Sequence, residues 1–210
     1  MDRLLQGIVN FSNSDFAKYK DLFVELKDQQ NPHTLFIGCS DSRVIPNLIT
    51  QTLPGELFTV RNIANIVPPY RETEEYVATT SAIEYAVQVL GVENIVVCGH
   101  SNCGGCSALY KESDTFEHIP HVQKWLELAS PVKEKVLNAL NTGENTPETR
   151  SWMTEQVNIV EQIKHLLTYP FITDKYIEGK LKILGWYYII ETGEVYNYNK
   201  ETGCFELISG

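Results

Sequence analysis

The sequence has no long apolar run and no leader-like start. Its longest apolar stretch, ILGWYYII at residues 183–190, is too short for a transmembrane helix, which needs about 20 apolar residues. The opening stretch MDRLLQGIVNFSNSDF lacks the charged start and long apolar segment of a signal peptide. We therefore expect a cytoplasmic protein without a membrane partner.

Positive charge is also scarce. The chain carries 17 Lys and Arg against 27 Asp and Glu, which gives a net charge of −10 at pH 7. Binding to nucleic acids depends on clustered Lys and Arg, so we expect no nucleic-acid partner. The sequence also contains neither of the nucleotide-binding patterns GxGxxG and GK[ST].

Short apolar runs alternate with long segments of helical periodicity. Strands are predicted in HTLFIG (33–38), GELFTVRNIAN (55–65) and ENIVVCGH (93–100), and a hairpin in 180–199 around Thr192-Gly193. Helices are predicted in 2–30 with a break near 10–16, in 74–92, from 104 onward, and in most of 119–168. This alternation predicts one α/β domain over residues 1–210, with a mostly parallel central sheet flanked by helices and a C-terminal hairpin.

Five cysteines are present, an odd number, in a chain long enough to form one substantial core. That favours metal or catalytic roles over a disulfide framework. His100 and Cys103 follow the end of one predicted strand, and Cys39 ends another. Ligand sites gather beyond the carboxyl ends of parallel strands. These three side chains can therefore converge on one zinc ion and leave its fourth position open.

Other residues near these ligands allow more than one interpretation. Asp41 is either a fourth metal ligand or an acceptor beside the metal, and Arg43 is spaced to hold its carboxylate in a bidentate pair. The alternative is an ordinary surface ion pair. Cys103 and Cys106 also have the CGGC spacing of a thiol redox pair. A non-catalytic zinc site closed by Asp41 is a third hypothesis.

The remaining cysteines and histidines have no ligand-like context. We interpret Cys98 and Cys106 as packing residues and assign Cys204 no role. We expect each of the other histidines to be a surface or capping residue; they are His33, His118, His121 and His165.

Four stretches together carry a family resemblance: CSDSR, PGELFTVRNIAN, HSNCGG and GWYYIIETG, in this order. They resemble the β-class carbonic anhydrases of bacterial type. The resemblance implies one Zn²⁺ per subunit, bound by Cys39, His100 and Cys103 beside an Asp41–Arg43 dyad. It implies reversible hydration of CO2 to bicarbonate and a proton by attack of zinc-bound hydroxide on CO2. As a hypothesis, Asp41 moves onto the zinc at low pH and stops the reaction.

The resemblance also implies a homodimer or a dimer of dimers. Residues 1–30 would form a helical arm packing on the partner subunit, and the active-site cleft would lie at the interface. Its apolar wall would be Phe58, Ile63 and Tyr85, with Gln30 reaching the neighbouring site as a hydrogen-bond donor. The alternative is that the three apolar residues belong to the core and that Gln30 is a solvated helix end.

One departure from the family pattern concerns regulation. Members with an additional, inhibitory bicarbonate site carry a Trp three residues before the first zinc cysteine, paired with an Arg and a Tyr. Here Phe36 occupies the Trp position, whereas Arg61 and Tyr188 match the other two. We therefore expect this chain to lack that site.

Overall fold

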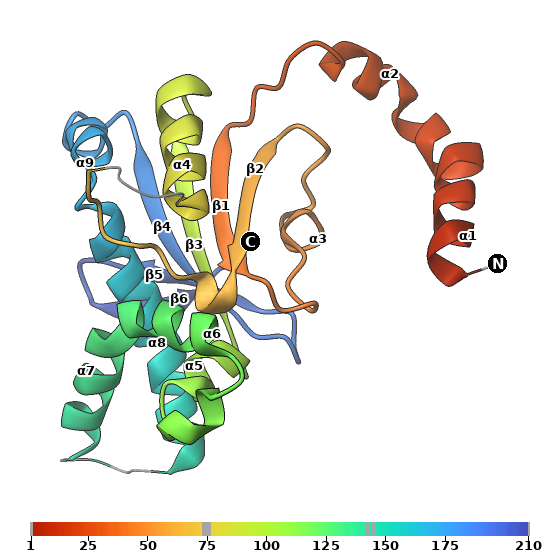
Figure 1. The fold of residues 1–210 in the computed structure, drawn as a ribbon. Helices are drawn as coiled ribbons and strands as arrows, with labels where there is room; N and C mark the ends of the chain where they lie inside the picture. The colour runs from red at the N-terminus through yellow and green to blue at the C-terminus, as the bar shows by residue number, and fades with distance from the viewer. Residues whose placement is uncertain (1, 73–76, 142, 144–145, 210) are drawn as a thin grey trace.

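The computed structural model describes residues 2–72, 77–141, 143 and 146–209. Its centre is a six-stranded sheet in the order β2-β1-β3-β4-β5-β6 (Figure 1). The strands are β1 (Thr34–Cys39), β2 (Leu57–Asn62), β3 (Asn94–His100), β4 (Lys182–Tyr188), β5 (Val195–Asn199) and β6 (Cys204–Leu207). The first four in sequence run parallel, and the last two add antiparallel neighbours. The predicted fold class and hairpin are confirmed; β6 was not predicted.

Helices precede, flank and connect these strands. The described α-helices are α1 (Arg3–Asn10), α2 (Phe16–Leu26), α3 (Pro46–Thr50), α4 (Ala78–Glu84), α5 (Gly104–Ala108), α6 (Pro120–Leu126), α7 (Ser130–Leu140), α8 (Pro147–Leu166) and α9 (Pro170–Ile177). The helix predicted over 74–92 begins at Ala78 and ends in a π-helical turn, Tyr85–Val89; residues 74–76 of that prediction lie outside the described residues. Of the helical segment predicted over 119–168, residues 142, 144 and 145 also lie outside them.

The core forms on both faces of β1 and β3. Leu35 and Ile37 face a large apolar cluster that includes Ile159 of α8, whereas Phe36 faces a smaller cluster on the other side of the sheet. Successive strand residues point to opposite faces, so a strand buried on both sides needs a continuous apolar run. This requirement explains the sequence LFIG in β1.

Helix α8 lies directly against β3 and β4, and Gly99 makes that approach possible. A Cβ atom at Gly99 would lie 2.7 Å from Cγ1 of Ile159, closer than packed carbon atoms come. The glycine before His100 therefore brings a helix next to the end of the strand where the predicted metal ligands lie.

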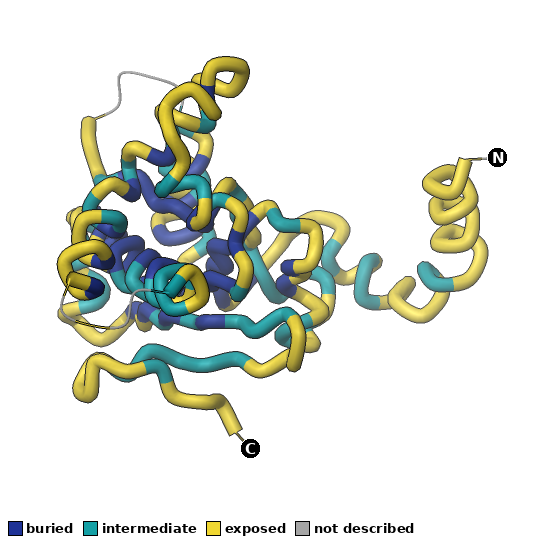
Figure 2. Tube along the Cα trace, turned by 90° about the horizontal axis from the view of Figure 1, so that it is seen from below, coloured by how far each residue is buried: buried dark blue, intermediate teal, exposed yellow. Residues whose placement is uncertain are grey.

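The N-terminal helices α1 and α2 stand apart from the sheet (Figure 1). Neither contains a buried residue, and Figure 2 shows the arm as mostly exposed. Large apolar side chains are nevertheless exposed along it: Leu4, Leu5, Ile8, Val9, Phe11, Tyr19 and Val24. A helical arm is confirmed, and its packing on a partner subunit stays a prediction.

The side chain of His165 is buried. The prediction of a surface or capping role for His165 is wrong, since this residue is 9% exposed and its Nδ1 lies 2.7 Å from the carbonyl oxygen of Val67. The polar ring is buried because the main chain after β2 supplies a partner.

None of the helices in the described residues has the length and apolar composition needed to cross a membrane.

Candidate metal centre

The carboxyl ends of β1 and β3 bring the three predicted ligands together. The two strands are parallel neighbours, with Gly38 opposite Cys98, so Cys39 and His100 emerge at the same edge of the sheet. The chain then turns at Asn102, whose φ of +55° is left-handed. Asn tolerates this conformation better than most residues. The turn returns Cys103 to the strand ends.

Cys39, His100 and Cys103 form a compact, buried group of donor atoms. Their ligand atoms all lie within 4.8 Å of one another, and the two sulfur atoms are 4.0 Å apart. Two thiolates on one tetrahedral zinc lie about 3.8 Å apart, given Zn–S bonds of about 2.3 Å. The spacing of the two thiols therefore fits a zinc ion.

The ring of His100 is oriented for a metal. Its Nδ1 lies 2.9 Å from the carbonyl oxygen of Ser101, so Nδ1–H donates there and leaves the lone pair on Nε2. The Nε2 atom is buried and has no hydrogen-bond partner among the described residues. A buried polar nitrogen without a partner is costly unless something binds it. Together with the sulfur spacing, this orphaned nitrogen shows that the three residues fit a metal ion.

Without a metal, both candidate thiols hold their protons. The Cys39 pKa is raised to about 12, first by the Cys103 thiol and then by burial. The Cys103 pKa is also raised to about 12, with the neighbouring Cys106 thiol as the largest cause. Burial acts to lower the pKa of His100, but the Cys39 thiol and the Ser101 carbonyl outweigh it, so the pKa is raised. A cation that binds here must therefore displace protons.

Asp41 lies beside the group but is turned toward Arg43. Arg43 Nε donates to Asp41 Oδ1 at 2.9 Å, Nη2 donates to Oδ2 at 2.8 Å, and the main-chain N–H of Arg43 donates to Oδ1 at 3.0 Å. These bonds hold the pKa of Asp41 well below its usual range. Asp41 Oδ2 is 3.9 Å from His100 Nε2. The carboxylate is thus ionised, near the ligands and engaged elsewhere.

Arg61 fixes the main chain of the same loop. Its Nε donates to the carbonyl oxygen of Cys39 at 2.9 Å and its Nη2 to that of Asp41 at 2.6 Å. The sequence marked Arg61 only for the regulatory site. Its partners here are main-chain oxygens, which no residue pattern reveals.

The role of Phe58, Ile63 and Tyr85 as an apolar wall stays a prediction, and the structure shows where these side chains lie. The rings of Phe58 and Tyr85 are in contact, with centroids 5.9 Å apart. Ile63 lies against α5, the helix that follows Cys103, since a Cβ atom on Gly105 would be 3.1 Å from Ile63 Cγ2. Tyr85 and Ile63 are 44% and 40% exposed. The core alternative is therefore wrong for these two side chains.

Gln30 lies away from the candidate metal centre of its own chain. It is exposed and precedes the amino end of β1, whereas Cys39 lies at the carboxyl end of that strand. Any contact of Gln30 with such a centre would therefore involve a second copy, and this role stays a prediction.

The other cysteines are free thiols. Cys98 and Cys106 are buried, Cys204 is exposed, and none of the five cysteines forms a disulfide in the part of the chain described. The burial of Cys98 and Cys106 in apolar clusters agrees with their interpretation as packing residues.

Glu155 is a residue of this region that the sequence did not mark. It lies on α8, is 2% exposed, and its Oε1 accepts a hydrogen bond from the main-chain N–H of Cys103 at 3.0 Å. One signal was present: Glu155 precedes Ile159 and Ile163 at intervals of four, which places a charged residue in the apolar stripe of a helix.

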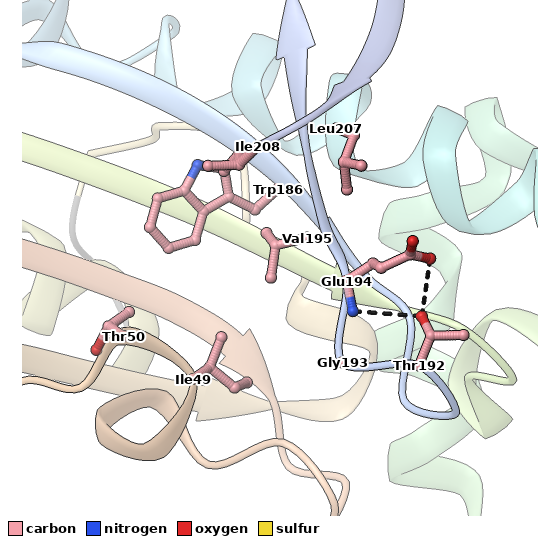
Figure 3. Close-up of a pocket in the computed structure, with 9 residues that line it drawn as sticks. All are labelled: Ile49, Thr50, Trp186, Thr192, Gly193, Glu194, Val195, Leu207 and Ile208. Carbon is pink, nitrogen blue, oxygen red and sulfur yellow. Dashed lines mark hydrogen bonds between the residues drawn. The ribbon is translucent and has the colours of Figure 1, made fainter. Parts of the chain in front are cut away.

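The three residues at the positions of the inhibitory bicarbonate site make other contacts. The Phe36 side chain is fully buried, with its ring edge-on to Trp186 at 6.3 Å. Arg61 binds the main chain as described, and Tyr188 packs against the cluster around Phe36. Trp186 also borders a separate cavity of about 520 Å³ between α3 and the C-terminal strands (Figure 3). None of the predicted site residues lines that cavity.

Comparisons with known proteins agree with this geometry. Residues 34–195 match the family model described as carbonic anhydrase. A carbonic anhydrase from Helicobacter pylori strain J99 is 43% identical over 204 residues, covering 96% of this chain and 92% of the relative. One from Synechococcus elongatus is 40% identical over 195 residues, covering 93% of this chain and 70% of the relative.

Solved structures give the class. The β-carbonic anhydrase CcaA superposes with a TM-score of 0.92 at 39% identity over 98% of each chain. A tetrameric β-carbonic anhydrase from Sordaria macrospora gives a TM-score of 0.81 at 31% identity over 96% of each chain. The chain therefore belongs to the carbonic anhydrase family, and within it to the β class.

Proposed function

We propose that the chain catalyses the reversible hydration of CO2 to bicarbonate and a proton, with one Zn²⁺ per subunit. The observation that carries the proposal is a converging set of three buried donors beside a carboxylate that Arg43 holds away from them. Three protein ligands and an open position are typical of catalytic zinc, whereas structural sites use four.

Cys39, His100 and Cys103 would hold the ion. Zinc bound there would supply hydroxide at near-neutral pH, from water whose pKa in bulk is about 16. Two thiolates cancel the charge of the metal, so the site is a weaker Lewis acid than one built from three neutral histidines. The surrounding residues must compensate.

Asp41 provides that compensation. As an ionised acceptor close to His100, it orients the group at the open position and favours ligands that have a proton to donate. Arg43 keeps Asp41 ionised and turned away. The apolar side chains of Phe58, Ile63 and Tyr85 would hold CO2 and exclude water.

Assembly is part of the proposal. The exposed apolar face of α1 and α2 supports packing of this arm on a second copy. The relative from Sordaria macrospora is described as tetrameric. We therefore propose a homodimer or a dimer of dimers, in which Gln30 of one copy donates to the neighbouring site. We also propose a cytoplasmic location.

Two other functions compete with this one. A redox protein would use Cys103 and Cys106, but Cys103 also lies 4.0 Å from Cys39, next to an imidazole that such a pair does not need. A non-catalytic zinc protein would be closed by Asp41, yet that carboxylate binds Arg43 by both oxygens.

One experiment separates the three. Zinc-loaded protein and the variants His100→Ala and Cys106→Ser are compared for metal content and for CO2 hydration by stopped flow. We expect one zinc per chain and hydration in the wild type, their loss in His100→Ala, and both kept in Cys106→Ser. Loss of the measured activity in Cys106→Ser but not in His100→Ala would support the redox protein. Bound zinc without CO2 hydration at any pH would support the non-catalytic zinc protein.

A further inference from the structure

Glu155 is a buried carboxylate, and its hydrogen-bond partners within the described part of the chain are all neutral. Oε1 accepts from the main-chain N–H of Cys103 at 3.0 Å and from the Ser151 hydroxyl at 3.2 Å, and Oε2 accepts from the Tyr187 hydroxyl at 2.7 Å. None of the ion pairs in the described residues includes Glu155. Burial of a charge without a counter-ion is costly, even when hydrogen bonds satisfy its oxygens.

Tyr187 encloses the second oxygen of Glu155. Tyr187 is 3% exposed, and its pKa is raised, first by burial and then by the hydrogen bond to Glu155. A phenol with a raised pKa keeps its proton and donates a hydrogen bond to the carboxylate. Tyr187 also lies on β4 opposite Gly99, next to the strand that carries His100. The carboxylate is thus enclosed between α8 and the strand ends that form the metal centre.

We propose that Glu155 is a positioning residue for the metal centre: its carboxylate fixes the main chain of Cys103 and supplies a negative charge behind the ligand loop that favours a cation there. This inference rests on the proposed function, because the cation that it invokes is the zinc ion proposed above. The hydrogen bond to the Cys103 N–H fixes the position of Cys103. The negative charge of Glu155 attracts a cation bound between Cys39, His100 and Cys103.

A merely structural role is the competing explanation, because α8 carries other buried polar contacts. One turn after Glu155, Asn158 Nδ2 donates to the carbonyl oxygen of Ala64 at 2.9 Å, and Gln162 Nε2 donates to Asn158 at 2.8 Å. Asn158 is as deeply buried as Glu155 but does not contact the ligand loop in any described interaction. It therefore offers a matched control on the same face of the helix.

The test compares Glu155→Gln with Asn158→Ala in zinc-loaded protein. Glutamine keeps the shape and can still accept from Cys103, while the Tyr187 hydroxyl can turn to accept from its amide. We expect zinc to be released to a chelating dye about tenfold faster in Glu155→Gln, in the range seen when residues supporting metal ligands are changed. We expect the midpoint of the pH profile for CO2 hydration to move about one unit lower, because removing a negative charge favours hydroxide over water at the metal.

Asn158→Ala should lower the unfolding temperature and leave the rate of zinc release unchanged. A Glu155→Gln protein with wild-type zinc release and an unmoved pH midpoint would overturn the inference. Tyr187→Phe gives a second measurement should Glu155→Gln not fold. It leaves the carboxylate that fixes Cys103 with one donor fewer, so zinc release should be faster than in the wild type, and release at the wild-type rate would again contradict the inference.

The two proposals fail differently. A wild-type protein that takes up no zinc refutes the proposed function. A wild type that holds zinc and hydrates CO2, with release from Glu155→Gln at the same rate, refutes only the role of Glu155.

Discussion

Arg43 donates hydrogen bonds to both carboxylate oxygens of Asp41, at 2.9 Å from Nε and 2.8 Å from Nη2. The same Nη2 donates to the carbonyl oxygen of Asn102 at 3.2 Å, in the turn between His100 and Cys103. One guanidinium therefore joins the two loops that carry the ligands. In the proposed function, this guanidinium would also keep Asp41 from closing the open side of the centre.

Arg43→Lys tests this arrangement. Lysine keeps the charge but cannot bind both carboxylate oxygens in a planar fork. We expect CO2 hydration to fall about 10- to 100-fold with zinc still bound, the usual effect of removing a residue that orients a metal ligand or its neighbour. Stopped-flow rates at matched zinc content measure the change. Wild-type activity in Arg43→Lys would show that the bidentate pair is not required.

The pH profile should fall steeply on the acidic side. The pKa of Asp41 lies well below its usual range, so its carboxylate stays ionised as the pH drops. An ionised Asp41 would therefore remain able to take the fourth position of a metal held by Cys39, His100 and Cys103, and it would then exclude the reacting group. The lowered pKa of Asp41 stabilises the folded state at pH values above the ordinary Asp pKa. This contribution is lost only as the pH falls through the lowered pKa. A low-pH structure with water still at the fourth position would refute this closure.

Metal affinity should depend strongly on pH. Because the pKa values of Cys39 and Cys103 are both about 12 in the metal-free chain, binding must release two protons near neutrality. We expect the apparent zinc affinity to fall about 100-fold for each unit by which the pH is lowered. Competition with a chelator of known affinity, at several pH values, measures the slope. A slope of zero would mean that the thiols are not the ligands.

The predicted packing of the N-terminal helical arm on a partner subunit is tested at Ile8, which is 62% exposed on α1. Ile8→Asp places a charge in the apolar face, so we expect dissociation of the assembly and lower hydration activity. Ile8→Leu keeps the apolar character and should behave as the wild type. Sedimentation of both variants gives the oligomeric state. An Ile8→Asp protein that assembles like the wild type would argue against packing through α1.

The sequence predicted the parts of the fold and site that follow from local pattern. Apolar runs predicted β1 and β3, and the meeting of parallel strand ends predicted that Cys39 and His100 converge. The short strand β6, CFEL, has too few apolar residues to be recognised. The partners of Arg61 are main-chain carbonyls, and two of the partners of Glu155, Cys103 and Tyr187, lie 52 and 32 residues away. Such contacts depend on tertiary packing and leave no local periodicity.

The most direct test is CO2 hydration by wild type and Asp41→Asn, each with one zinc per chain. Asparagine keeps the size of Asp41 but loses its charge and can no longer act as an ionised acceptor. We predict rapid hydration by the wild type and a fall of about 10- to 100-fold in Asp41→Asn at unchanged zinc content. Equal rates in the two proteins, or no hydration by the zinc-loaded wild type at any pH, would contradict a catalytic centre in which Asp41 guides the reacting group.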